Sequence, residues 1–151
     1  LPHQLPITAV PGQATLIMTV HPQCPCSTAS MSELQVLMAH CQGRLAAYVI
    51  FAEPAELKQR LESTSLWNDA GQIPHLTRIC DDNGTMTRRL GAKTSGQVFL
   101  YDSQGILRFS GGITESLEHS GANAGRSAIE AIVHDEKPST QVTSVFGCAL
   151  W

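Results

Sequence analysis

The sequence predicts an α/β fold with a central mixed β-sheet and helices on both faces. Short apolar runs bounded by turn residues alternate with segments of helical periodicity through the first two-thirds of the chain. Two further apolar runs, separated by a four-residue turn, then predict an antiparallel hairpin. The 151 residues, of which 42% are hydrophobic, are enough for one domain with a full core. The expected element order is β-α-β-α-(β)-α-β-β-α, with right-handed crossovers between parallel strands.

The first elements are the most clearly marked. Residues 1–13 contain three prolines and predict an irregular lead-in, and the apolar run 14–20 predicts a buried central strand. A helix is expected from about residue 28 to residue 40. Its apolar positions recur at i, i+3, i+4 and i+7, which places one stripe against the core: Leu34, Leu37, Met38 and Cys41. Within this stripe, Cys41 is expected to be a small buried apolar residue.

The middle of the chain is less regular. The run 45–51 predicts a second buried strand, and Pro54 predicts the first turn of a helix through about residue 61. Residues 66–74 are expected to be irregular. A short strand at 76–80, a turn and a short helix at 85–90 complete this region.

The last third contains the hairpin, a helix and a tail. Its strands are expected at 97–101 and 106–110, joined by a turn at 102–105. Asn123 predicts the N-cap of a helix that runs to about residue 134. The expected organisation is therefore a lead-in at 1–13, a domain at 14–137 and a tail at 138–151 that carries Cys148.

Composition excludes several function classes. The net charge is −3 and no basic run exceeds Arg88-Arg89, so no nucleic-acid partner is expected. No run approaches the roughly 18 apolar residues of a membrane span. Because the chain begins with Leu1 rather than Met, we expect a missing upstream segment, which is a signal peptide, an N-terminal anchor or an artificial boundary of the sequence.

The segment His21-Pro22-Gln23-Cys24-Pro25-Cys26-Ser27-Thr28-Ala29-Ser30 joins the first strand to the first helix. Backbone N–H groups and the positive end of a helix dipole lower a thiol pKa at such a junction. Cys24 is therefore the candidate nucleophile. Pro25 would fix the turn, and His21 would add a positive charge or donate a hydrogen bond.

The five cysteines cannot all pair within one chain, because their number is odd. Cys26 has three candidate roles: resolving thiol for Cys24, metal ligand beside Cys24, or partner of a remote cysteine. Cys148 is the main remote candidate, since the tail is long enough to fold back and Gly147 allows a close approach. A Cys24–Cys26 disulfide would need a loop conformation at Pro25, because side chains two residues apart diverge in regular structure.

The element order and the cysteine segment resemble the thioredoxin-like superfamily, in its branch of extracytoplasmic thiol-disulfide reductases and redoxins. Proteins of that branch often carry a cysteine segment like C-P-P-C-R-A-E-M-P-E-L. Aligned without gaps, Cys24 takes the nucleophile position, Met31, Glu33 and Leu34 coincide, and the second family cysteine falls on Ser27. Residues 98–105 resemble a family segment in which an apolar strand is followed by a D-x-x-G turn. The family's cis-proline would fall near Gly96, in the pair Ser95-Gly96.

The resemblance implies a thiol-disulfide oxidoreductase that uses Cys24 as nucleophile and Cys26 or Cys148 as resolving thiol. The supporting residues would be His21, Pro25, Ser27, Ser95 and Gly96. It implies a partner protein that carries a thiol or disulfide, no required cofactor, and a location outside the bacterial cytosol, periplasmic or membrane-anchored.

Two alternatives remain open. A metallochaperone-like module would bind Cu(I) or Zn(II) through Cys24 and Cys26 with His21, His119 or Cys148, since soft thiolates and imidazole suit these ions. A peroxiredoxin-like peroxidase is the lesser alternative, because the Thr-x-x-Cys signature of that family is absent before Cys24.

Overall fold

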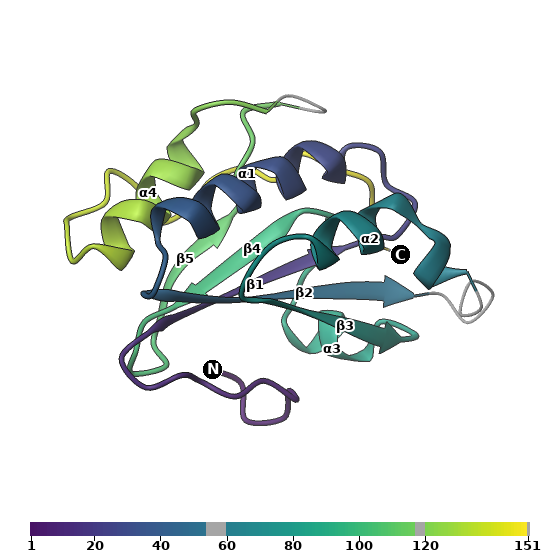
Figure 1. The fold of residues 1–151 in the computed structure, drawn as a ribbon, viewed down its shortest axis with the longest axis horizontal. Coiled ribbons are helices and arrows are strands. Elements are labelled where there is room, and N and C mark those ends of the chain that lie inside the picture. Colours follow the sequence, from purple (N-terminus) through teal and green to yellow (C-terminus); the bar gives the residue numbers. More distant parts are fainter. Residues whose placement is uncertain (54–59, 117–119, 151) are drawn as a thin grey trace.

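The computed structural model describes residues 1–53, 60–116 and 120–150, and it contains a five-stranded mixed sheet (Figure 1). The strand order is β3-β2-β1-β4-β5. The strands are β1 Ala14–Val20, β2 Leu45–Glu53, β3 Leu76–Asp82, β4 Gln97–Tyr101 and β5 Leu107–Gly111. β1, β2 and β3 are parallel, whereas β4 is antiparallel to β1 and to β5. The predicted α/β class, the mixed sheet and the hairpin at one side are confirmed.

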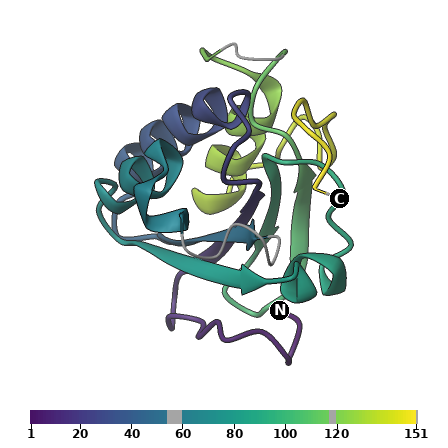
Figure 2. The same cartoon turned by 90° about the vertical axis from the view of Figure 1, so that its right-hand side faces the viewer.

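Four α-helices are described, and they cover both faces of the sheet (Figures 1 and 2). α1 Ser27–His40, α2 Ser65–Gly71 and α4 Ala124–Val133 lie on one face, and α3 Thr85–Arg89 lies on the other with the N-terminal lead-in. Alternation along β1 divides the core accordingly: Leu16 and Met18 belong to the larger apolar cluster and Ile17 to the second. β1 is therefore buried on both sides, as its continuous apolar run predicts.

The expectation that residues 66–74 are irregular is wrong, because they include most of α2. Asn68, Asp69 and Gly71 are weak helix formers, which hid this helix in the sequence. Tertiary packing overrides that preference. The Thr64 side chain accepts a hydrogen bond from the Trp67 N–H at the N-cap, and Leu66 and Ala70 are buried beneath the helix.

The helix expected at 54–61 falls mainly on residues 54–59, which lie outside the described residues. Shortly after them the chain forms a 3₁₀ turn at Leu61–Ser63, labelled η1.

α1 and α4 are joined by an ion pair between the buried Glu33 and the partly buried Arg126. The Glu33 carboxylate is 2.6 Å from the Arg126 guanidinium and also accepts hydrogen bonds from Gly121 N–H and the Asn123 side chain. Asn123 caps α4 as predicted, since its side chain accepts from the Arg126 N–H. Because α4 is thus fixed to α1, the start of α1 is held in a defined position over the sheet.

The C-terminal tail folds back along the sheet edge and then reaches the start of α1, as Figure 2 shows in yellow beside β5. Val142 forms a parallel bridge with Ser110 of β5, and Ala149 forms an antiparallel bridge with Thr94. A Cβ on Gly111 or Gly112 would clash with the backbone of the tail at residues 143–144. The two glycines therefore let the tail lie directly against the chain at the end of β5.

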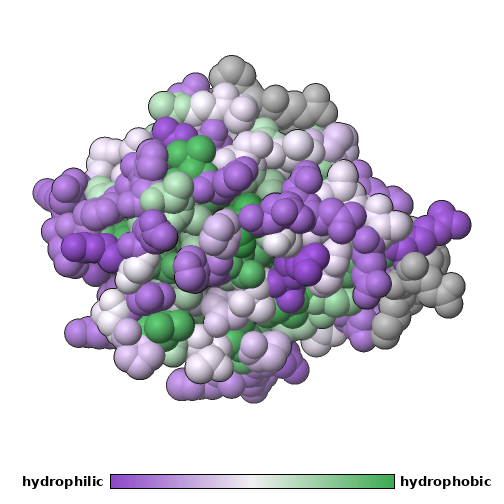
Figure 3. Space-filling view, in the orientation of Figure 1, coloured by the Kyte–Doolittle hydropathy of each residue, from purple (hydrophilic) through white to green (hydrophobic). Residues whose placement is uncertain are grey.

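The surface in the orientation of Figure 1 is mainly polar, with small apolar patches between polar residues (Figure 3). Among the described residues, no helix has both the length and the hydropathy that a membrane crossing requires.

Candidate thiol site at the start of helix α1

Cys24 lies in a turn that links β1 to α1. Its N–H donates to the His21 carbonyl at 3.1 Å, and its carbonyl accepts from the Ser27 N–H at 3.1 Å. Cys26 is the N-cap residue of α1 and already has helical backbone angles, φ −63° and ψ −27°. The Cys-Pro-Cys segment is therefore a tight turn that leads directly into the helix.

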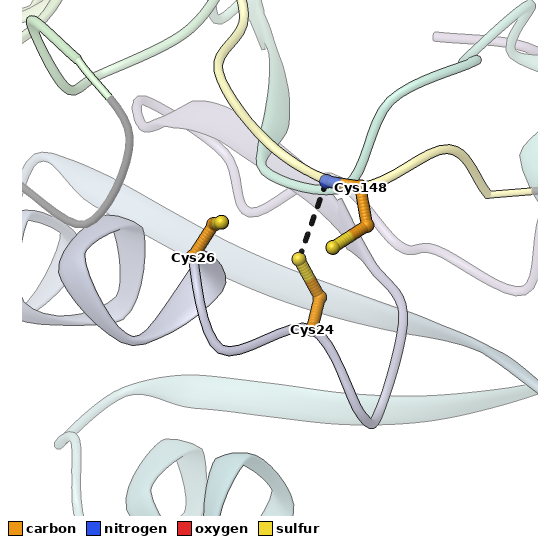
Figure 4. Close-up of side chains that lie close together, drawn as sticks. All are labelled: Cys24, Cys26 and Cys148. Atoms are coloured by element: carbon orange, nitrogen blue, oxygen red, sulfur yellow. Dashed lines mark hydrogen bonds between the residues drawn. The ribbon is translucent and has the colours of Figure 1, made fainter.

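The tail brings a third thiol to this turn. The Sγ atoms of Cys24, Cys26 and Cys148 all lie within 4.8 Å of one another. Figure 4 shows Cys24 and Cys26 on the β1–α1 turn, with Cys148 entering from the tail strand above them. The Cys148 N–H donates to Cys24 Sγ at 3.3 Å, and no disulfide joins the three residues.

The environment of Cys24 favours its thiolate. Burial, the largest single influence, raises the pKa, since the side chain is only 1% exposed. Hydrogen bonds from the Cys148 thiol and N–H and from the Ser27 and Ser95 side chains outweigh burial, and the pKa of Cys24 falls to about 7. The same thiol–thiol hydrogen bond raises the pKa of Cys148. The Cys148 thiol therefore stays protonated and donates a hydrogen bond to the Cys24 sulfur. Near neutral pH, Cys24 is therefore a nucleophile with a protonated thiol beside it.

Ser27 and Ser95 form the polar floor of the site. Both are buried, and their hydroxyl oxygens are 2.6 Å apart. Ser95 Oγ also accepts from the His21 N–H at 2.8 Å, which fixes the hydroxyl beside the cysteine turn. Ser27, on which the resemblance places the second family cysteine, thus supports the Cys24 thiolate through a hydrogen bond.

Gly96 is the residue near which the resemblance places the family's cis-proline, and the described residues contain no cis peptide bond. Its φ is +93°, and a Cβ there would lie 2.9 Å from Ser30 Oγ of α1. The Gly96 N–H donates to the Thr19 carbonyl at 2.7 Å. Glycine therefore lets this loop lie against both β1 and α1 and brings Ser95 to the thiol site.

The other candidate residues have different outcomes. The His21 ring accepts a hydrogen bond from the Gln23 N–H, and burial lowers its pKa, which disfavours the positive charge that was one of its two expected roles. Pro25 is exposed in the turn between the two cysteines. His119 lies outside the described residues.

The remaining cysteines lie apart from the three-thiol site. Cys41 is buried as predicted, and burial raises its pKa to about 11. Cys80 lies with Glu53 and Asp82 in a second cluster, which no pattern in the sequence indicated. Its thiol donates to Glu53 Oε2 at 2.9 Å, and burial together with the two carboxylates raises its pKa to about 12. These three residues lie together because β2 and β3 pair in parallel, with Glu53 opposite Asp82. The sequence alone does not show which strands are neighbours.

No family model and no curated protein matches this chain. Solved structures do match. A hypothetical protein from Sinorhizobium meliloti has a TM-score of 0.73 and 21% identity, over 92% of this chain and 79% of that one. An uncharacterised conserved protein from Geobacillus kaustophilus has a TM-score of 0.73 and 19% identity, over 93% and 78%. A secreted Mycobacterium tuberculosis disulfide oxidoreductase homologous to E. coli DsbE has a TM-score of 0.54 and 15% identity, over 83% of each chain.

The chain has a thioredoxin-like fold. Within this thioredoxin-like fold, Cys24 lies between the central strand β1 and helix α1, as the resemblance implied. The C-terminal tail carries the Cys148 thiol to the same point. The fold therefore places two further sulfurs within 4.8 Å of Cys24 Sγ.

Proposed function

We propose that this protein is a thiol-disulfide oxidoreductase in which Cys24 is the nucleophile and Cys148 is the resolving thiol. The observation that carries the proposal is the hydrogen-bonded pair: Cys24 has a pKa of about 7, and the Cys148 thiol donates to its sulfur. Cys148 is taken as the resolving thiol because it makes two hydrogen bonds to Cys24, one from its thiol and one from its N–H.

The exchange proceeds in two balanced steps. The Cys24 thiolate attacks one sulfur of a partner disulfide, a mixed disulfide forms, and the partner's other sulfur leaves as a thiolate. The Cys148 thiol then gives its proton to the partner thiolate released in the first step, and the Cys148 sulfur attacks Cys24 Sγ. A Cys24–Cys148 disulfide forms, and the partner's second sulfur leaves as a thiolate. The partner gains two electrons and the chain loses two. The same steps reversed oxidise a partner dithiol, and the partner's potential sets the direction.

Trapping the intermediate tests the proposal. Reduced protein is mixed with oxidised glutathione, quenched in acid and analysed by mass spectrometry. We expect Cys24→Ser to abolish exchange and Cys148→Ser to accumulate glutathione on Cys24, whereas Cys26→Ser exchanges and resolves. Cys80→Ser is the matched control, since that thiol lies in the other cluster. Exchange at the wild-type rate in Cys24→Ser would overturn the proposal.

We also propose that the protein works outside the reducing cytosol. Its support is the likeness to a secreted disulfide oxidoreductase. Acid trapping and alkylation in source cells should find the Cys24–Cys148 pair in both oxidation states outside the cytosol. Detection in the cytosolic fraction alone would contradict this location.

The spacing of the three sulfurs favours a second candidate function, the binding of Cu(I) or Zn(II). Two thiolates bound to one ion at about 2.3 Å lie about 4 Å apart, close to the separations of up to 4.8 Å in this cluster. The donor set is all sulfur, which suits Cu(I) best. His21 is not among the clustered candidate ligands of the described residues.

Competition with a coloured Cu(I) chelator under anaerobic conditions tests this candidate. We expect one Cu(I) per chain and a loss of affinity of at least tenfold in Cys148→Ser, with Cys80→Ser unchanged. Metal-free protein with intact thiols and no micromolar Cu(I) affinity would remove this function.

A further inference from the structure

A second cluster of metal-binding side chains lies at the carboxyl ends of β2 and β3. Cys80 and Asp82 are two residues apart on β3, so their side chains lie on the same face of the sheet. Glu53 ends β2 and is opposite Asp82 in the parallel pairing. Phe51, which is opposite Cys80, packs edge-to-face on Trp67 of α2. The cluster therefore lies on the face of the sheet that α2 covers.

The distances within this cluster fit a single metal ion. Cys80 Sγ lies 2.9 Å from Glu53 Oε2 and 3.7 Å from Asp82 Oδ1. All three ligand atoms lie within 4.8 Å of one another. Ligand atoms bound to one tetrahedral Zn(II) at about 2.0–2.3 Å lie about 3.5 Å apart. Small side-chain adjustments therefore bring all three atoms to the same ion.

The Glu53 carboxylate is the group that points to a cation. The residue is 2% exposed. Its Oε2 accepts a hydrogen bond from the Cys80 thiol, whereas Oε1 is buried and has no hydrogen-bond partner among the described residues. No described residue forms an ion pair with Glu53. A buried carboxylate oxygen without a partner is costly, and a bound cation would offset that cost.

We propose that Glu53, Cys80 and Asp82 bind one Zn(II) ion at this end of the sheet. The thiolate favours Zn(II) over Mg(II) and Ca(II), which take oxygen ligands. The two carboxylates favour Zn(II) over Cu(I), which prefers sulfur. On binding, Cys80 Sγ exchanges its proton for a bond to the ion, the proton passes to solvent, and no electron is transferred. This inference is independent of the reaction proposed for Cys24.

The position of the cluster indicates what the ion would do. Cys80 and Asp82 are exposed, so the ion can enter from solvent and a water molecule can complete its coordination. β3 is the edge strand of the described sheet, and the ion would link its end to the end of β2. Because the ligands are brought together only in the folded chain, zinc binding should stabilise the fold.

Zinc binding is tested in the full-length chain with Cys26→Ser and Cys148→Ser, which removes two sulfurs of the other cluster. Affinity is measured by competition with a coloured Zn(II) chelator under anaerobic conditions. We expect one Zn(II) per chain, and at least tenfold weaker binding when Cys80→Ser or Glu53→Gln is added. Glu62→Gln is the matched control, since it changes an exposed carboxylate in η1 and should leave the affinity unchanged.

Two further readouts locate the ion. Co(II) in place of Zn(II) should give a thiolate-to-metal charge-transfer band that Cys80→Ser abolishes. Zn(II) should raise the midpoint of thermal unfolding of the background variant, and the added Cys80→Ser should remove this increase. If Glu53→Gln does not fold cooperatively, Asp82→Asn takes its place, because that residue is exposed.

A zinc affinity that Cys80→Ser leaves unchanged, or the lack of micromolar affinity in the background variant, would overturn the inference. Disulfide exchange is measured at the three-thiol site of the wild-type chain, where Cys80→Ser has no expected effect. The failure of one proposal can thus be told from the failure of the other.

Discussion

Four hydrogen-bond donors make Cys24 a reactive thiol despite its burial. Two come from the tail residue Cys148 and two from the Ser27 and Ser95 hydroxyls. Where burial is not offset in this way the thiol pKa rises, as at Cys41, whose neighbour Glu130 raises it further. The contrast between these two buried cysteines indicates that polar and charged neighbours set the direction in which each thiol pKa moves.

Removing one donor should raise the pKa of Cys24. Hydrogen bonds to charged groups contribute about 1.5 kcal/mol or more, so Ser95→Ala is expected to raise the pKa by about one unit. The measurement is the rate of Cys24 alkylation by iodoacetamide against pH, resolved by peptide mass mapping. In the wild type the rate should fall as pH drops through about 7, where the thiolate is protonated.

Thr28→Ala is the matched control for this profile, since the Thr28 side chain is exposed at the start of the same helix. Its midpoint should equal that of the wild type. An unchanged midpoint in Ser95→Ala would show that the Ser95 hydroxyl does not support the thiolate.

At the scale of elements, the Glu33–Arg126 pair holds the α1–α4 layer together. Glu33 is 2% exposed, and its carboxylate is bonded to Arg126 and to the segment before α4. A buried charge of this kind is costly when it loses its partner, because nothing replaces its hydration. The pair therefore affects the thiol site through the position of α1 and touches no sulfur itself.

Arg126→Met should lower the free energy of unfolding by about 3 kcal/mol, since it leaves the Glu33 carboxylate buried without its cation. Urea unfolding at pH 7 measures the loss. The double variant Glu33→Gln with Arg126→Met should recover at least half of it, because the uncompensated charge is gone. A double variant no more stable than the single one would contradict this explanation.

At the scale of the whole molecule, the tail closes the chain on itself. Cys24 and Cys148 lie near opposite ends of the sequence, and glycines at 111, 112 and 147 permit the close backbone approaches along the route between β5 and the thiol site. A disulfide between the two residues would cross-link nearly the whole domain. Long closed loops restrict the unfolded chain strongly and so favour the folded state.

Oxidation of this pair should therefore stabilise the protein by about 2–4 kcal/mol. Guanidinium unfolding of the oxidised and reduced forms measures the difference. Cys148→Ser should show no difference between oxidising and reducing buffers. Equal stability of the two wild-type forms would indicate that the cysteines do not pair with each other.

Much of this architecture is local in origin and was predictable. The apolar run of β1 and the stripe of Leu34, Leu37 and Met38 on α1 arise from periodicity, which each segment carries within itself. The position of Cys24 between them was predictable for the same reason, and so was the cap at Asn123. α2 was missed because its residues form a helix only when Leu66 and Ala70 find a core to pack against.

The sequence by itself determined the α/β class, the central strand and the candidate nucleophile at the start of α1. Only the tertiary structure decided which thiol lies hydrogen-bonded to Cys24, what covers it, and how its pKa falls. The physical reason is distance along the chain. Hydrogen bonds between Cys24 and Cys148, or Ser27 and Ser95, join residues whose proximity depends on the closure of long loops, and no local pattern encodes that closure.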